Sequence, residues 1–239
     1  MLGILSGLVS LAMLMLVGRV VALAGSGFES RVGMSYTWYA VSGALVHGLG
    51  MSALGAFRRV VRREQLQGTL EQLLASGRSP VVVVVLAGSA ELVLQAVAFV
   101  SAGFVASWVT GTALPAPAAL GVAGLYACGM AGLGLASAGV TIVCKEGEPI
   151  AWVFGMLSGA LGGVCFPSFL LPAWLAAAAR LLPTTHALAL VRASLGGAPL
   201  PKLPLVALAA FGAIAAVSGV VVLRWGLSKA RCAGTLARY

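Results

Sequence analysis

The side chains that could do chemistry in this sequence are few, and two of them lie inside long apolar runs. Glu91 lies about ten residues into the run 81–109, near mid-depth, where an ionised carboxylate is costly and polar side chains are usually functional. It is either a protonated residue that hydrogen-bonds to a neighbouring helix or a group that contacts substrate or handles protons. Arg19 lies within the run 2–24, at a cost of roughly 2.5–3.5 kcal/mol on insertion scales, and it either snorkels or lines a polar path.

The sequence predicts no catalytic residue and no metal site. His47 and His186 have no acid or cysteine at ligand spacing, and we expect both to be hydrogen-bonded structural residues. The four cysteines lack the paired spacing of a metal site or a disulfide framework, and we expect them to pack: Cys128, Cys144, Cys165 and Cys232. The sequence also has no H-E-x-x-H, no G-x-S-x-G and no Asp, which argues against an intramembrane enzyme.

Six apolar runs must position these side chains. They cover residues 2–24, 36–57, 81–109, 118–143, 150–166 and 203–223. A helix of about 20 residues crosses a hydrocarbon core of about 30 Å, and a chain with 60% apolar and 9% charged residues is unlike a soluble domain. We therefore expect an all-α, polytopic integral membrane protein with about six transmembrane helices, forming a single permease domain over residues 1–239.

The first two runs carry signals at their ends. Ala22-Leu23-Ala24 resembles a signal-peptide cleavage site, but no basic residue precedes the first run as a signal peptide would require. Either alternative leaves residues 25–33 outside. Tyr36, Trp38 and Tyr39 cluster at the start of the second run, where amphipathic rings favour the membrane interface.

The basic residues lie in the gaps between apolar runs and predict the orientation. Ten would be on the inner side: Arg58, Arg59, Arg62, Arg63, Arg78, Lys145, Arg224, Lys229, Arg231 and Arg238. Four would be outside: Arg31, Arg180, Arg192 and Lys202. This bias predicts a multi-pass protein of the cell membrane with both termini in the cytoplasm. The cations are not interleaved with aromatics along one face, so no nucleic-acid partner is expected.

The gap 58–80 contains a segment with helical periodicity. As a helix it would place four leucines on one stripe, opposite the charged residues: Leu66, Leu70, Leu73 and Leu74. Periodicity alone is compatible with an interfacial helix that rests on lipid headgroups, helped by the upstream arginines.

A second unusual segment follows the fifth run. Pro167, Pro172 and Pro183 each remove a helix donor, and the backbone freed in this way cannot face lipid without partners. We expect short helices packed against protein, or a position at the outer surface, between the fifth and sixth spans. Trp174 fits an interfacial anchor.

Both segments resemble the transmembrane permease subunits of type-2 ABC exporters. That family carries E-x-x-x-G-T-x-E-x-L in its first cytoplasmic loop, and this pattern begins here at Glu64. It also carries G-V-x-F-P, L-P-x-W and L-P-x-x-x-A-L followed by R, and these begin here at Gly163, Leu171 and Leu182 and end at Arg192. The likeness covers most of the chain beyond about residue 36.

The resemblance implies a transport subunit that is not itself an enzyme. The loop helix of the family docks on a separate ATP-binding cassette subunit, a role that would fall to Glu64, Gly68, Thr69, Leu70 and Glu71. ATP and Mg would be bound by that partner, because no G-x-x-x-x-G-K-[ST] occurs here, and no cofactor is expected in this chain. The cargo would be a hydrophobic or amphipathic substrate, such as a drug, a lipid or a glycan, moved outward. The second pattern assigns to the outer segment Pro167, Pro172, Trp174, Pro183 and Arg192.

Glycines in the fifth run predict a close helix contact. Gly155, Gly159 and Gly163 are spaced four apart, and small residues at this interval allow helix backbones to approach. The neighbour could be a helix of the same chain or of a second permease copy or paralogue, and the resemblance favours a dimer.

The alternative function is a proton-coupled secondary transporter. Glu91 and Arg19 would then couple transport to protons, and no ATPase would be needed. The sequence has no obvious internal repeat of the kind that such transporters often carry, and this alternative leaves Gly68 and Thr69 unexplained.

Overall fold

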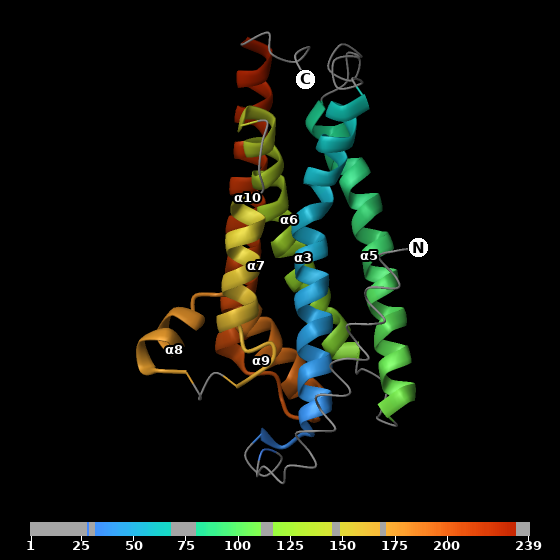
Figure 1. Cartoon of the computed structure of the whole chain (residues 1–239), viewed down its shortest axis with the longest axis vertical. Coiled ribbons are helices and arrows are strands. Elements are labelled where there is room, and N and C mark those ends of the chain that lie inside the picture. The colour runs from blue at the N-terminus through green and yellow to red at the C-terminus, as the bar shows by residue number, and fades with distance from the viewer. Residues whose placement is uncertain are drawn as a thin grey trace. The chain divides into compact units, whose positions relative to one another are not determined.

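The computed structural model describes residues 28, 32–67, 80–110, 117–144, 149–167 and 171–232. This part of the chain contains seven helices and no strand (Figure 1). The helices are α3 (Tyr36–Gln67), α5 (Pro80–Thr110), α6 (Pro117–Cys144), α7 (Pro149–Leu161), α8 (Ala173–Ala179), α9 (Pro183–Leu195) and α10 (Lys202–Cys232). The predicted all-α class is confirmed for these residues, and the predicted span 2–24 lies outside them.

Four helices, α3, α5, α6 and α10, are long and apolar enough to cross a membrane. They contain 28 to 32 residues, which corresponds to about 42–48 Å and exceeds a hydrocarbon core of about 30 Å. The protein is therefore membrane-embedded. α3 and α10 continue about ten residues past the predicted span ends at 57 and 223, because arginine and lysine are good helix formers and the end of an apolar run does not end a helix.

The fifth predicted span, 150–166, is only partly helical. α7 contains 13 residues, about 20 Å, and ends at Leu161. Gly163 beyond it has φ +76°, a left-handed conformation that glycine adopts without a steric penalty. The prediction that Gly155, Gly159 and Gly163 share one helix face is therefore wrong for Gly163.

The chain divides into two compact units. Unit 1 comprises residues 1–48, 100–123 and 157–205, and unit 2 comprises residues 49–99, 124–156 and 206–239. α3, α6 and α10 begin in unit 1 and end in unit 2, whereas α5 and α7 begin in unit 2 and end in unit 1. These five helices lie in the second to sixth predicted spans, and α7 covers only part of the fifth.

The number of spans in the described chain is smaller than the predicted six. Length and apolarity give four candidate spans, or five if α8 and α9, bent by 85° against each other, count as one. α8 and α9 lie entirely in unit 1, whereas the shorter α7 has one end in each unit.

The core of unit 2 is built by four helices. α3, α5, α6 and α10 each contribute buried apolar side chains to one cluster. Its members are Ala56, Phe57, Val61, Val84, Ala131, Leu135, Ala138, Ile142, Leu223, Leu227 and Ala230.

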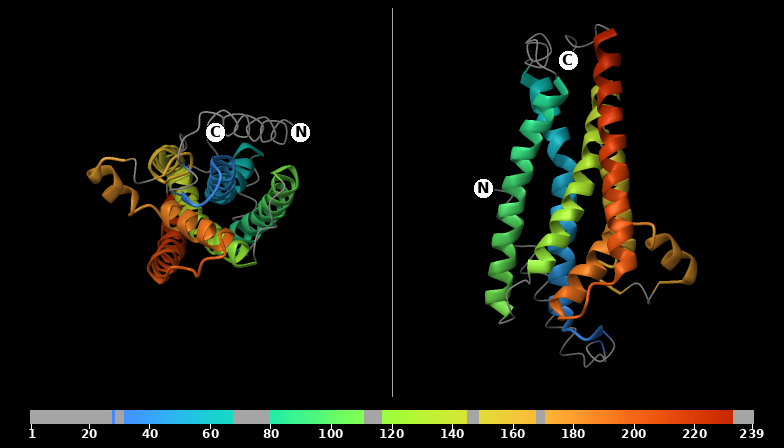
Figure 2. Two further views of the ribbon diagram at one scale, coloured as in Figure 1. Left: turned by 90° about the horizontal axis from the view of Figure 1, so that it is seen from below. Right: turned by 180° about the vertical axis from the view of Figure 1, so that it is seen from behind.

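Backbone contact through glycines joins α6 to α10 in unit 2. A Cβ at Gly219 would collide with the carbonyl oxygen of Gly132, and a Cβ at Gly226 would collide with that of Gly139. The glycines of each helix are seven residues apart, close to two turns, and they pair in the same order, so the two helices run in the same direction (Figure 2). Small residues allow such close approach between membrane helices. The seven-residue glycine spacing was the sequence signal for this contact, and it was missed.

Candidate functional site

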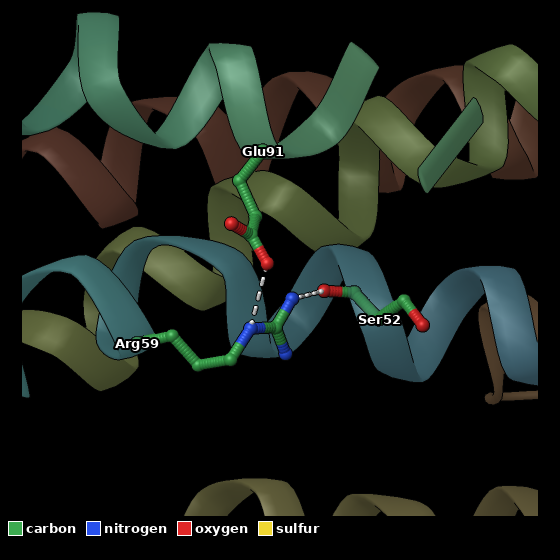
Figure 3. Close-up of polar contacts among 3 residues, drawn as sticks. All are labelled: Ser52, Arg59 and Glu91. Atoms are coloured by element: carbon green, nitrogen blue, oxygen red, sulfur yellow. Dashed lines mark hydrogen bonds and ion pairs between the residues drawn. The ribbon is translucent and has the colours of Figure 1, made fainter. Parts of the chain in front are cut away.

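Glu91 of α5 pairs with Arg59 of α3 within unit 2. Arg59 Nε lies 3.0 Å from Glu91 Oε1 (Figure 3). The same guanidinium donates from Nη2 to the carbonyl oxygen of Ser52 at 3.0 Å. The arginine side chain thus points back along α3 toward its N-terminus, the usual direction for long side chains on a helix. As a result, the charge lies beside the apolar part of α3.

Glycines make room for this contact. A Cβ at Gly55 would collide with Arg59 Nη1, and one at Gly88 would collide with the ring of Phe57. The missing side chains let the guanidinium lie flat on α3 and let α5 approach it. The Arg59 and Glu91 side chains keep 36% and 22% of their surfaces exposed, so the pair is partly desolvated.

The partner of Glu91 is a cation, which neither sequence alternative anticipated. We expected either a neutral hydrogen bond between helices or a free functional carboxylate. Glu91 was also expected near mid-depth of its span, but the pairing brings it level with the part of α3 between Ser52 and Arg59, where the apolar run gives way to arginines. A carboxylate there can be paired with an arginine that reaches back from the basic end of the neighbouring span.

The basic end of α3 continues as helix to the first residue of the loop pattern. Arg58, Arg62 and Arg63 precede Glu64 without a break, and α3 ends at Gln67. Glu64 is half-buried, whereas Leu66 is exposed. The other predicted coupling residues, Gly68, Thr69, Leu70 and Glu71, lie outside the described residues.

In unit 1, Arg192 of α9 holds the segment that follows α7. Its Nη1 donates to the carbonyl oxygen of Gly163 at 2.9 Å, and its Nη2 donates to those of Tyr39 at 3.0 Å and Val164 at 3.2 Å. The guanidinium carbon also lies 3.4 Å from the centroid of the Tyr39 ring. The planar, always charged guanidinium can serve several acceptors and an aromatic face at once.

Tyr39 and two glycines complete this arrangement. The Tyr39 hydroxyl donates to the Gly163 carbonyl at 3.1 Å, and a Cβ at Gly43 would collide with the carbonyl oxygen of Val164. The left-handed Gly163 turns its carbonyl toward both donors. Tyr39 is only 4% exposed, so its ring packs inside the protein, and this role in the second pattern's geometry was missed.

The predicted outer segment forms two short helices that begin at prolines. Pro172 is the N-cap of α8, and Pro183 is the first residue of α9, where a missing N–H costs nothing. Pro167 and Pro183 are buried, whereas Pro172 and Trp174 are exposed. Pro172 and Pro183 therefore start helices instead of breaking one.

Gly155 and Gly159 face α3 of the same chain. A Cβ at Gly155 would lie 2.8 Å from Met51 Cε in unit 2, and a Cβ at Gly159 would lie 3.8 Å from the His47 ring in unit 1. His47 Nδ1 lies 3.4 Å from the hydroxyl of the buried Ser158. His186 Nε2 donates to the carbonyl of Arg180 at 2.7 Å. Both histidines thus make hydrogen bonds within unit 1.

The described residues contain no group of three or more His, Cys, Asp or Glu that could hold a metal ion. Within the same part of the chain, Cys128, Cys144 and Cys165 are free and exposed, so the expectation that they pack in the interior is wrong for these three. Arg19 and the side chain of Cys232 lie outside the described residues.

Comparison with known proteins adds no family to this geometry. A scan against protein-family models gives no match for the chain, and a search of curated proteins also finds none.

Proposed function

We propose that the protein is a transmembrane permease subunit of an ATP-driven type-2 ABC exporter. The observation that supports this proposal is the continuity of α3. One helix of 32 residues, about 48 Å long, carries the apolar span, the Arg59 pair with α5, and Glu64, the first residue of the docking pattern. A continuous helix is a rigid element that can transmit displacement from one end to the other.

The geometry suggests how force would pass from an ATP-binding subunit to the spans. Arg59 lies five residues before Glu64, about 7.5 Å along the helix axis. A displacement of the Glu64 end would reach α5 through the ion pair between Arg59 and Glu91. It would also reach α6, because a Cβ at Gly134 of α6 would lie 2.5 Å from the Leu54 carbonyl oxygen of α3.

The cargo in this proposal is hydrophobic or amphipathic. Large apolar side chains are exposed along α5 and α10, including Leu94 and Val217, and such surfaces are compatible with lipid and with apolar substrates. A drug, a lipid or a glycan remains the substrate class. The proposed assembly contains a second permease copy or paralogue and a separate ATP-binding subunit, with six spans, both permease termini in the cytoplasm, and ATP and Mg on the partner.

Charge reversal at the docking pattern tests the proposal. Glu64→Arg combined with Glu71→Arg should reduce co-purification with the ATP-binding subunit at least severalfold and abolish vanadate-sensitive, substrate-stimulated ATP hydrolysis. The matched control is Glu29→Arg, the same change in the predicted external loop, which should assemble normally. Unchanged assembly together with unchanged coupled ATP hydrolysis in the double variant would contradict the proposal.

A proton-coupled secondary transporter is the second candidate. The observation in its favour is the half-buried Glu91, whose carboxylate could exchange its arginine partner for a proton. Transport in reconstituted vesicles distinguishes the two functions. An uncoupler would stop a proton-coupled transporter, which needs no ATP. Vanadate would stop only an ATP-driven exporter.

A further inference from the structure

One side of α10 in unit 2 changes from apolar to basic along its length. Its exposed side chains recur every three or four residues, as expected for one face of a helix. We call this surface the α10 lipid face, and its residues are Ile214, Val217, Val221, Arg224, Trp225 and Lys229. The opposite side of the same helix carries the buried Leu223, Gly226 and Leu227.

The exposed apolar side of α10 continues back to Val206, and its part from Ile214 to Arg224 has about the length of one leaflet. Ile214 and Arg224 are ten residues apart, about 15 Å along the helix, and half of a hydrocarbon core of about 30 Å is the same length. Ile214, Val217 and Val221 are 60–69% exposed. An acyl chain that lies along these three residues would end at the level of Arg224.

The basic part of the face has the residue types of a membrane interface. Trp225 is 51% exposed, and the Lys229 ammonium lies 5.1 Å from the centroid of its ring. Arg224 and Lys229 are both exposed. Tryptophan favours the headgroup level, and the cation–π contact holds the lysine beside it.

Charge selects the occupant of this face. The described side chains of unit 2 include six cations, namely Arg58, Arg59, Arg62, Arg63, Arg224 and Lys229, and two acids, Glu64 and Glu91, so their net charge is 6 − 2 = +4. A second copy that met the same face would place Arg224 and Lys229 near their own equivalents, and like charges facing each other are unfavourable. An anionic headgroup is attracted instead.

We propose that the α10 lipid face binds an anionic phospholipid, with its phosphate at Arg224 and Lys229 and an acyl chain along Ile214, Val217 and Val221. The site lies on one helix within one unit and does not depend on the exporter assignment. The site would hold the lipid at the basic end of α10. Clusters of lysine and arginine next to a membrane span attract acidic lipids.

Quenching of Trp225 by brominated lipids tests the site. The protein is reconstituted in phosphatidylcholine vesicles that contain an equal minor fraction of either dibrominated phosphatidylglycerol or dibrominated phosphatidylcholine. The Trp225 contribution is the difference between the wild type and Trp225→Phe. We expect quenching by the anionic lipid to exceed quenching by the neutral lipid about two- to fivefold, and we expect this excess to shrink at high salt.

Charge variants decide between a site and a nonspecific effect. The double variant Arg224→Gln, Lys229→Gln should be quenched equally by both lipids. The double variant Arg224→Lys, Lys229→Arg keeps both charges and should keep most of the excess. Its result also shows that substitution at these two positions does not by itself unfold the helix. Lys202→Gln, which removes a charge at the other end of α10, is the matched control and should behave as the wild type. Equal quenching by both lipids in the wild type, or an excess that survives charge removal at Arg224 and Lys229, would overturn the proposal.

Discussion

Two arginines in this protein bind their partners in different ways. Arg59 binds one carboxylate and one backbone carbonyl. Arg192 binds three carbonyls and an aromatic face, and the described residues of unit 1 contain no carboxylate that could pair with it. Arg59 therefore links two helices through charge, whereas Arg192 fixes the backbone of the segment after α7.

A double-mutant cycle on Arg59 and Glu91 tests whether this link stabilises the protein. Arg59→Gln leaves a partly desolvated carboxylate without its cation, and Glu91→Gln leaves the cation with the Ser52 carbonyl only, so each single change should be destabilising. The double change should cost less than the sum, with a coupling of about 1 kcal/mol, as expected for a pair at this level of exposure. Unfolding in mixed detergent micelles measures the free energies. Arg63→Gln is the control on the same helix. Strictly additive effects of Arg59→Gln and Glu91→Gln would contradict a stabilising ion pair between the two helices.

Glu91 and Arg192 could be singled out from the sequence, but their partners could not. Glu91 stood out as an acid in an apolar run, and Arg192 belonged to a pattern. Arg59 lies 32 residues from Glu91, and Tyr39 lies 153 residues from Arg192, so these contacts depend on how helices pack and on no local spacing. The packing of Tyr39 was missed because an aromatic at the end of a span also fits the membrane interface.

At the scale of elements, apolar runs predicted the helices well and their ends poorly. The second, third, fourth and last runs each coincide with a long helix. Polar residues extended α3 and α10, since hydrogen bonding along a helix continues wherever propensity allows. α7 was shortened by a glycine conformation that no apolar count detects. The contact between α6 and α10 was missed because the glycines that make it are spread over two runs.

Glycine substitution tests the contact between α6 and α10. Gly219→Ala places a Cβ against the backbone of Gly132, which cannot move without separating the helices. We expect a loss of about 1–3 kcal/mol in the free energy of unfolding, the usual cost of overpacking. Gly124→Ala is the matched control, because a Cβ there meets nothing within 4 Å and should be neutral or stabilising by about 0.5–1 kcal/mol. Equal thermal stability of the two variants in detergent would contradict the contact.

At the scale of the whole molecule, α7 and the four long helices begin alternately in the two units. α3 and α6 begin in unit 1, α5 and α7 begin in unit 2, and α10 again begins in unit 1. The parallel contact of α6 with α10 within unit 2 requires the chain between them to return once, and this stretch of the chain contains α7, α8 and α9. Charge asymmetry and apolar runs predict spans of alternating direction. They do not show that the chain between α6 and α10 contains a short helix followed by a segment held by Arg192.

Cysteine labelling tests the predicted orientation of the whole molecule. In a background without native cysteines, Arg63→Cys places a thiol at the basic end of α3, and Ala198→Cys places one between α9 and α10; both positions are exposed. A membrane-impermeant maleimide added to intact cells should label Ala198→Cys strongly and Arg63→Cys only after permeabilisation, because the excess of basic residues belongs on the cytoplasmic side. The cysteine-free background controls for nonspecific reaction. Labelling of Arg63→Cys alone in intact cells would invert the proposed orientation, and labelling of both positions would show that α3 does not separate them across the membrane.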